Sequence, residues 1–89
     1  MSEQQVVILL YVKESCGLCE DMREQVEEFL SLHYTATAEL EVRDIEDNAE
    51  WFALFREYVP TLVVNDQEVC HYFFNAQELT EALECPSHI

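Results

Sequence analysis

Basic residues are scarce in this sequence. It holds 4 lysine and arginine residues against 19 acidic ones, which gives a formal net charge of −15 at pH 7. Nucleic-acid binding needs a cationic surface that displaces phosphate counterions, so a chain this acidic is not expected to bind DNA or RNA. Anionic membranes are disfavoured for the same reason. A basic protein partner would fit the charge, and so would a well-solvated surface.

Flexible connections and long apolar runs are also missing. With 1 glycine and 2 prolines in 89 residues the sequence has no linker, and we expect one small domain over residues 1–89. The longest apolar run, residues 6–12, is far too short to cross a bilayer. For a chain that begins at Met1, the lack of a positively charged leader favours the cytoplasm, where thiols are kept reduced.

The apolar pattern in the first half predicts strand, helix and strand. Residues 6–12 are continuously apolar and rich in β-branched side chains, which is typical of a strand buried on both faces. From Leu18 to residue 30 apolar side chains recur about once per helical turn between acidic ones, so an amphipathic helix ending near residues 32–34 is predicted. Residues 39–45 alternate in polarity and indicate a strand near a sheet edge.

The second half predicts a helix, a hairpin and a last helix. Asp47 with Glu50 has the spacing of a capping box, and the aromatic residues of the helix that follows are assigned to the core. Pro60 is expected to end that helix. Residues 61–64 and 68–74 read as the two strands of a hairpin. A second cap pattern, at Asn75 and Glu78, precedes the short last helix.

The resulting order, β-α-β-α-β-β-α, predicts an α/β fold with a four-stranded mixed sheet and helices on both faces. The first two strands are expected to be parallel because a βαβ connection crosses over in the right-handed sense. The hairpin then extends the sheet. This is a thioredoxin-like arrangement.

Two cysteines three positions apart, Cys16 and Cys19, stand where the first strand meets the first helix. This spacing brings their Cα atoms to about 5–6 Å, within disulfide range. Unpaired N–H groups and the helix dipole at a helix start stabilise an anion, so the Cys16 pKa is expected below the value of about 8.5 for a free thiol. Cys16 is therefore the predicted nucleophile in thiol–disulfide exchange, and Cys19 the resolving thiol.

The neighbours of the pair bear on this chemistry. Gly17 allows a tight turn and leaves the sulfur uncovered. Lys13 is the only lysine of the chain and favours a thiolate at Cys16, while the acidic residues on either side of the pair oppose it. Exposed carboxylates are screened by solvent and backbone amides are fixed, so we predict that the lowering of the Cys16 pKa prevails.

The main alternative is a non-enzymatic module, for metal binding or protein interaction, on the same fold. Cys85 and His88 have the spacing of metal ligands, and together with Cys16 and Cys19 they could form a Cys₃His zinc site. Structural zinc pairs usually occupy tight knuckles rather than a junction between a strand and a long helix, so no metal is predicted in the first reading.

The remaining cysteine and histidines carry no motif. Cys70 lies in the returning strand of the hairpin and is expected to be a small buried hydrophobic residue. His33 and His71 lack a partnered pattern, so each is assigned a structural or solvated role.

The sequence resembles the glutaredoxin branch of the thioredoxin superfamily, in particular its short bacterial members. Tyr-Val-Lys at residues 11–13 before the cysteine pair, Asp-Ile at residues 44–45 and Tyr-Val-Pro-Thr at residues 58–61 carry the resemblance. The order of elements agrees from residue 6 to residue 83.

The resemblance implies a substrate-binding set around the pair. Pro60 matches the cis-proline that faces the redox cysteines in this superfamily, and a cis bond would aim the backbone of Val59 at an extended substrate. Lys13 matches a lysine that glutaredoxins place near the glycine carboxylate of glutathione. Gly17 and Leu18, between the cysteines, complete the expected set.

The sequence also departs from the family patterns. Gly17 and Leu18 stand where glutaredoxins usually carry a proline and an aromatic residue, and Ser15 replaces the tryptophan typical of thioredoxins. Residues 72–77 contain no glycine where glutaredoxins have a Gly-Gly pair that helps to bind glutathione. From the sequence as a whole we expect a monomeric oxidoreductase that needs no cofactor. Its expected substrate is a protein disulfide or a glutathione mixed disulfide, and glutathione is a candidate reductant.

Overall fold

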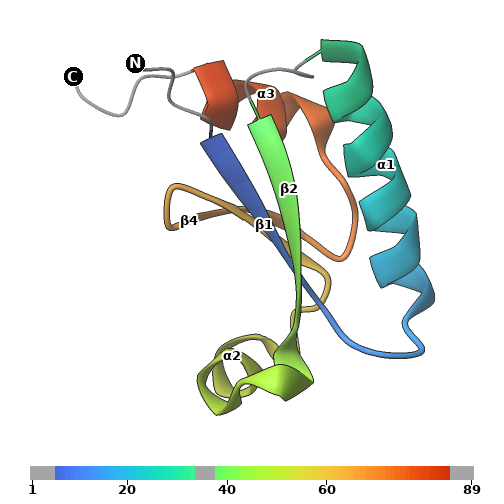
Figure 1. Cartoon of the computed structure of the whole chain (residues 1–89), viewed down its shortest axis with the longest axis vertical. Helices are drawn as coiled ribbons and strands as arrows, with labels where there is room; N and C mark the ends of the chain where they lie inside the picture. The colour runs from blue at the N-terminus through green and yellow to red at the C-terminus, as the bar shows by residue number, and fades with distance from the viewer. Residues whose placement is uncertain (1–5, 34–37, 85–89) are drawn as a thin grey trace.

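A computed structural model describes residues 6–33 and 38–84, and these ranges form a four-stranded sheet with helices on both faces (Figure 1). The strand order is β2-β1-β3-β4. β1 pairs in parallel with β2 and antiparallel with β3, which forms an antiparallel hairpin with β4. The elements are β1 (Val6–Val12), α1 (Gly17–His33), β2 (Ala38–Asp44), the 3₁₀ helix η1 (Ile45–Asp47), α2 (Ala49–Phe55), β3 (Thr61–Val64), β4 (Gln67–His71) and α3 (Ala76–Glu84). This is the predicted fold.

The two faces of the sheet carry separate apolar clusters. On one face α1 and α3 pack against alternate residues of β1 and β3, with Ile8, Leu62 and Leu79 completely buried. On the other face Tyr11, Ile45 and the partly buried aromatic residues of α2 form a second cluster. None of the described helices is long and apolar enough to cross a membrane.

β1 is covered on both faces only in its second half. Ile8 and Leu10 are fully buried, whereas the Val7 side chain on the opposite face is 41% exposed and Leu9 is half-buried. The reason is the length of α2, which has seven residues and packs near the carboxyl end of β1, against Tyr11. The prediction of a strand buried on both faces was therefore correct for one half of β1 alone.

The buried stripe of α1 differs slightly from the predicted one. Cys19, Met22, Val26 and Leu30 are buried and face the sheet, while Leu18 is 40% exposed. Steps of three and four residues from Cys19 keep a side chain on one helix face, and Leu18 lies about 100° away from Cys19 around the axis. The assignment of Leu18 to the stripe was wrong.

α2 begins one residue later than the capping pattern predicted. Its N-cap is Asn48, whose side-chain oxygen accepts hydrogen bonds from the N–H groups of Glu50 (2.9 Å) and Trp51 (3.1 Å). Asp47 belongs instead to η1, which precedes the helix. Aspartate and asparagine cap equally well, so the extra turn of η1 decided between two adjacent candidates.

The aromatic helix α2 supplies less of the core than predicted. Trp51 and Phe55 contact Tyr11, with ring centroids 5.7 Å and 4.2 Å away, but Phe52 and Leu54 are 40% and 61% exposed. A short helix lying on a sheet buries only one side. α2 also ends at Phe55, well before Pro60, so the proline does not terminate it.

The hairpin is present, with an earlier end than predicted. Asn65 and Asp66, at φ +54° and +67°, form the two-residue turn between β3 and β4. β4 stops at His71 rather than at residue 74, because Tyr72 adopts φ +68° and turns the chain out of the sheet. The predicted cap of α3 is confirmed, since Asn75 accepts a hydrogen bond from a backbone N–H of its first turn.

Candidate active site

Cys16 and Cys19 are joined by a disulfide at the amino end of α1. Their Cα atoms are 5.2 Å apart, which agrees with the separation expected from the spacing. The turn that connects β1 to this helix carries Ser15 at φ +57°, a conformation that reverses the chain direction immediately before the pair. The pair therefore lies at the junction between β1 and α1, the longest described helix.

Cys16 is the N-cap of α1. Its carbonyl oxygen accepts the first helical hydrogen bond from the Glu20 N–H (3.2 Å), and its Sγ accepts a hydrogen bond from the Cys19 N–H (3.1 Å). In most helices the side-chain oxygen of serine, threonine or aspartate fills this position. A thiolate at this position would accept the same N–H, and a hydrogen bond to an ionised acceptor is stronger than one to a neutral atom.

The two sulfur-bearing side chains differ in exposure. Cys19 is 3% exposed and belongs to the apolar cluster with Ile45 and Val59, whereas Cys16 is only partly buried at the edge of that cluster. An external disulfide can therefore approach Cys16 from solvent, and Cys19 can be reached through Cys16. The sequence predicts unequal roles for the two cysteines, and the structure shows that their exposure is unequal. The roles themselves stay a prediction.

Two of the residues predicted to bind substrate, Val59 and Lys13, differ in burial. Val59 is buried in the cluster that contains Cys19, and the Val59–Pro60 peptide bond is cis. Lys13 is exposed in the turn before Cys16 and forms no ion pair within the described residues. Each arginine, by contrast, is paired with a glutamate: Arg23 with Glu27, Arg43 with Glu41 and Arg56 with Glu57.

Arg43 supports the aromatic cluster behind the pair. Its guanidinium lies 4.8 Å from the centre of the Trp51 ring and donates a hydrogen bond to the Tyr11 hydroxyl (3.0 Å). The hydrogen bond with Glu41 raises the pKa of Arg43 above its usual value, so the charge is permanent. Arg43 thus links β2 to Tyr11 of β1 and Trp51 of α2. Sequence reasoning missed it, because a single arginine in an edge strand carries no motif.

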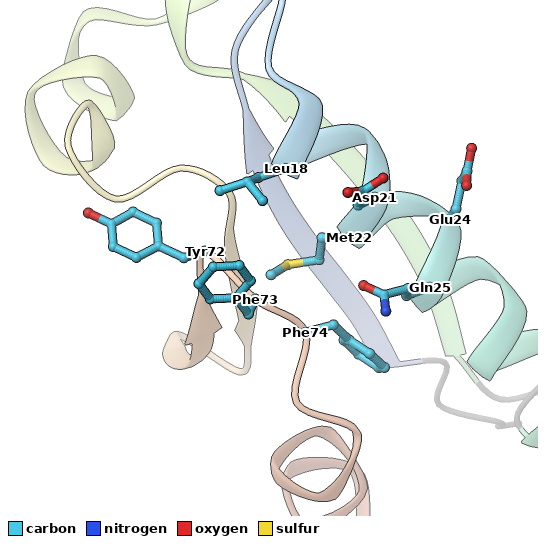
Figure 2. A pocket seen from close by; sticks show the side chains of 8 residues that line it. All are labelled: Leu18, Asp21, Met22, Glu24, Gln25, Tyr72, Phe73 and Phe74. Atoms are coloured by element: carbon cyan, nitrogen blue, oxygen red, sulfur yellow. The ribbon is translucent and has the colours of Figure 1, made fainter.

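A groove at the amino end of α1 was also not predicted from the sequence. It has a volume of about 360 Å³ and lies between α1 and residues 72–74, with Leu18 at the end nearest the cysteines (Figure 2). Tyr72 and Phe73 are exposed on its other side. The available signal was the run Tyr-Phe-Phe after β4, which places large apolar side chains where the family pattern has glycine.

Cys70 lies apart from the pair. It sits in β4 on the face that packs against α1 and α3, and it is a free, half-buried thiol. Burial raises its pKa, the acidic neighbours Glu68 and Glu78 act in the same direction, and a backbone hydrogen bond from Asn75 opposes them. The expected packing role agrees with this position, although the burial is partial.

The zinc alternative stays a prediction. Cys85 and His88 lie outside the described residues. Within residues 6–33 and 38–84 no group of three or more histidine, cysteine, aspartate and glutamate side chains could hold a metal ion.

Residues 7–84 match the family of glutaredoxin-like domains (DUF836). The chain belongs to this family. No curated protein matches the glutaredoxin-like chain.

Solved structures share the fold of this glutaredoxin-like domain. Protein Ne2328 from Nitrosomonas europaea is 28% identical with a TM-score of 0.74, and the match covers 90% of this chain and 93% of that one. A mutant thioredoxin from Halobacterium salinarum is 22% identical with a TM-score of 0.62, covering 97% and 78%. Thioredoxin 1 from Thermosipho africanus is 19% identical with a TM-score of 0.59, covering 88% and 90%. The two thioredoxins establish the thioredoxin-like fold.

Proposed function

We propose that this glutaredoxin-like domain is a thiol–disulfide oxidoreductase that uses Cys16 as nucleophile and Cys19 as resolving thiol. One observation carries the proposal: the two cysteines form a disulfide at a helix start, with Cys16 accessible and Cys19 buried. A structural staple would not need an accessible sulfur. The family membership supports the same chemistry.

The reaction consists of two thiol–disulfide exchanges. The Cys16 thiolate attacks one sulfur of a substrate disulfide, forms a mixed disulfide and releases the other substrate sulfur as a thiolate. The Cys19 thiol then loses its proton and attacks Cys16 Sγ, which releases the second substrate thiolate and closes the Cys16–Cys19 disulfide. Two electrons pass from the pair to the substrate, and the two released thiolates take up protons from water according to their pKa values.

The first turn of α1 favours the attacking state. In the reduced protein the Cys19 N–H, which is 3.1 Å from Cys16 Sγ in the disulfide form, is available to the thiolate. Val59 and Pro60 lie on the loop beside the pair, where an extended substrate would pass, and Lys13, Gly17 and Leu18 border the pair along the sequence. We assign these five residues to substrate binding. Regeneration of the dithiol requires an external thiol, either glutathione or a reduced dithiol protein.

Trapping of the intermediate tests the proposal. Cys19→Ser leaves Cys16 without its resolving thiol, so the reduced variant should accumulate one mixed disulfide on Cys16 when it meets a disulfide substrate. Intact-mass and peptide mass spectrometry would identify the adduct and its position. Adducts that remain at the level of a Cys16→Ser/Cys19→Ser protein would contradict the proposal.

A matched control uses Cys70, one of the two cysteines outside the pair. Cys70→Ser in the Cys19→Ser background should trap the same adduct at the same rate, because Cys70 lies in β4 away from the cluster of the pair. An adduct that disappears with Cys70→Ser would instead place the nucleophile in the strand. Wild-type protein that forms no Cys16–Cys19 disulfide in oxidised glutathione would also overturn the assignment.

A further inference from the structure

The groove beside the cysteine pair has an apolar floor and exposed apolar walls. Met22 is buried beneath it, and Leu18 and Phe73 face each other across it (Figure 2). Leu18 is 40% exposed and Phe73 is 69% exposed, so both offer apolar surface to a bound chain. Leu18 is also one of the two residues between the cysteines. A polypeptide joined to Cys16 Sγ therefore starts two residues before Leu18, at the amino end of the helix that borders the groove.

The segment that presents Phe73 is held in place by the loop of Pro60. The Tyr72 N–H donates a hydrogen bond to the Pro60 carbonyl (2.8 Å), and the Tyr72 hydroxyl donates one to the Glu57 carbonyl. Tyr72 itself adopts φ +68°, which is unfavourable for a residue with a bulky side chain. Such strained residues cluster at binding sites, where the surroundings fix them. The apolar wall is thus formed before any substrate arrives, which lowers the entropy cost of binding.

The charge of the groove is negative. Asp21 and Glu24 border it along α1, and no lysine or arginine lines it. Arg43 and Arg56 are paired with glutamates outside the groove, and Arg23, which is next to Glu24 on α1, is paired with Glu27. A ligand that carries carboxylates, such as glutathione, would meet repulsion here, whereas an ammonium or guanidinium group would be attracted.

We propose that the groove binds a segment of a protein disulfide substrate that carries an apolar side chain next to the reactive cysteine and a lysine or arginine further along. The proposal rests on the function proposed above and specifies its substrate class. An α-helix rises 1.5 Å per residue, which places Asp21 about 7.5 Å and Glu24 about 12 Å beyond Cys16 along the axis. An extended chain advances about 3.3 Å per residue, so the basic residue stands about two to four positions from the substrate cysteine.

A second copy of this chain is a poor occupant. Each copy carries a net charge of −15, and the groove presents acidic residues to whatever enters it. Two such surfaces repel one another at moderate ionic strength. A basic polypeptide satisfies both the apolar and the electrostatic character of the groove.

Matched peptides test the inference. Each contains one cysteine as a mixed disulfide with 5-thio-2-nitrobenzoate, whose release reports attack by Cys16. The first carries leucine beside the cysteine and lysine two and four positions away, the second replaces both lysines by glutamate, and the third replaces leucine by serine. At low ionic strength we expect the first peptide to react about tenfold faster than the second, and the difference to shrink with salt.

Charge variants locate the origin of this preference. Asp21→Asn with Glu24→Gln should reduce the lysine-to-glutamate rate ratio to about one third of its wild-type value. Glu28→Gln with Glu39→Gln removes the same two charges from exposed positions outside the groove and should leave the ratio within about twofold. Equal effects of the two double variants, or a wild-type ratio near one, would overturn the inference.

Phe73→Ser should remove most of the preference for leucine over serine, and an unchanged preference would count against the apolar wall.

Two further measurements separate this inference from the proposed function. Reduction of a small neutral disulfide, hydroxyethyl disulfide, depends on Cys16 and Cys19 and not on the charge of the groove. If it proceeds while the peptides react equally, the function stands and the groove inference fails. If hydroxyethyl disulfide is not reduced, the proposed function fails, and the groove is tested separately by binding. A cysteine-free lysine peptide is added to the Cys16→Ser/Cys19→Ser protein, and changes in the NMR chemical shifts of the Leu18 and Phe73 backbone amides are expected. If these shifts do not change, the groove inference is refuted.

Discussion

Cys16 and Cys70 are both partly buried cysteines of one small domain, and they have opposite surroundings. Cys16 caps a helix, and its sulfur accepts the N–H of Cys19. Cys70 lies in β4 opposite Leu62, and burial raises the pKa of its thiol.

The difference predicts that partial exposure alone does not make a thiol reactive and that its backbone surroundings also matter. A helix start presents several N–H groups without backbone partners, and these are free to stabilise an anion. Cys70 lies in the edge strand β4, where its half-buried sulfur packs against the apolar core, and the backbone hydrogen bond from Asn75 does not offset the rise in pKa that burial causes. We therefore expect backbone position, more than the fraction of surface exposed, to distinguish the reactivity of Cys16 from that of Cys70. Four predictions test this contrast.

The largest expected effect is on turnover. Cys16→Ser removes the nucleophile and should lower disulfide reductase activity by about a thousandfold or more, whereas Cys70→Ser should leave it within about twofold. Initial rates with a fixed disulfide and an excess of thiol reductant measure both. A loss of comparable size in Cys70→Ser, with the fold intact by circular dichroism, would remove the contrast.

The second prediction concerns alkylation of the reduced protein. The Cys16 pKa is expected below about 8.5 and the Cys70 pKa lies above its ordinary value, so at pH 7 iodoacetamide should modify Cys16 at least about tenfold faster. Site-resolved mass spectrometry over a range of pH gives both profiles. An apparent pKa of Cys16 at or above about 8.5 would contradict the proposal that the start of α1 lowers the pKa of this thiol.

The third prediction is an opposite pH dependence of stability. A raised pKa means that the folded state retains the Cys70 proton, so the contribution of this thiol is complete below the unfolded thiol pKa of about 8.5 and declines as pH rises through it. The lowered pKa predicted for Cys16 has the reverse sign, with stability lost as pH falls through its folded value. Urea unfolding of reduced wild-type, Cys70→Ala and Cys16→Ser proteins at several pH values measures both differences, and parallel curves would show that neither thiol is perturbed.

The smallest effect is expected for Lys13. Its ammonium is exposed, so Lys13→Gln should slow alkylation of Cys16 by no more than about twofold to threefold, and only at low salt. Arg23→Gln, which removes a positive charge about two turns beyond Cys16 along α1, serves as the control and should have less effect. A tenfold loss for Lys13→Gln would make the lysine, rather than the helix start, the main source of activation.

Local patterns predicted the elements well, and local competition explains the errors. Seven apolar residues before a two-cysteine turn correctly located β1 and the start of α1. Asn48 and Asp47 are adjacent and equally good caps, so the choice depended on a 3₁₀ turn that sequence does not reveal. Phe52 and Leu54 are apolar yet exposed, because the position of α2 on the sheet decides which of its sides is buried.

By itself, the sequence determined that two cysteines at disulfide spacing stand at a strand–helix junction, because spacing and helix periodicity act over a few residues. The unequal roles of the two cysteines stay a prediction. Only the tertiary structure decided that Val59 lies in the cluster of the pair and that Phe73 faces Leu18 across an acidic groove. These residues are separated from the cysteines by about half the chain. Their meeting depends on the strand order β2-β1-β3-β4 and on the turn at Tyr72, where sheet pairing and hydrogen bonds between distant segments fix positions that no local pattern encodes.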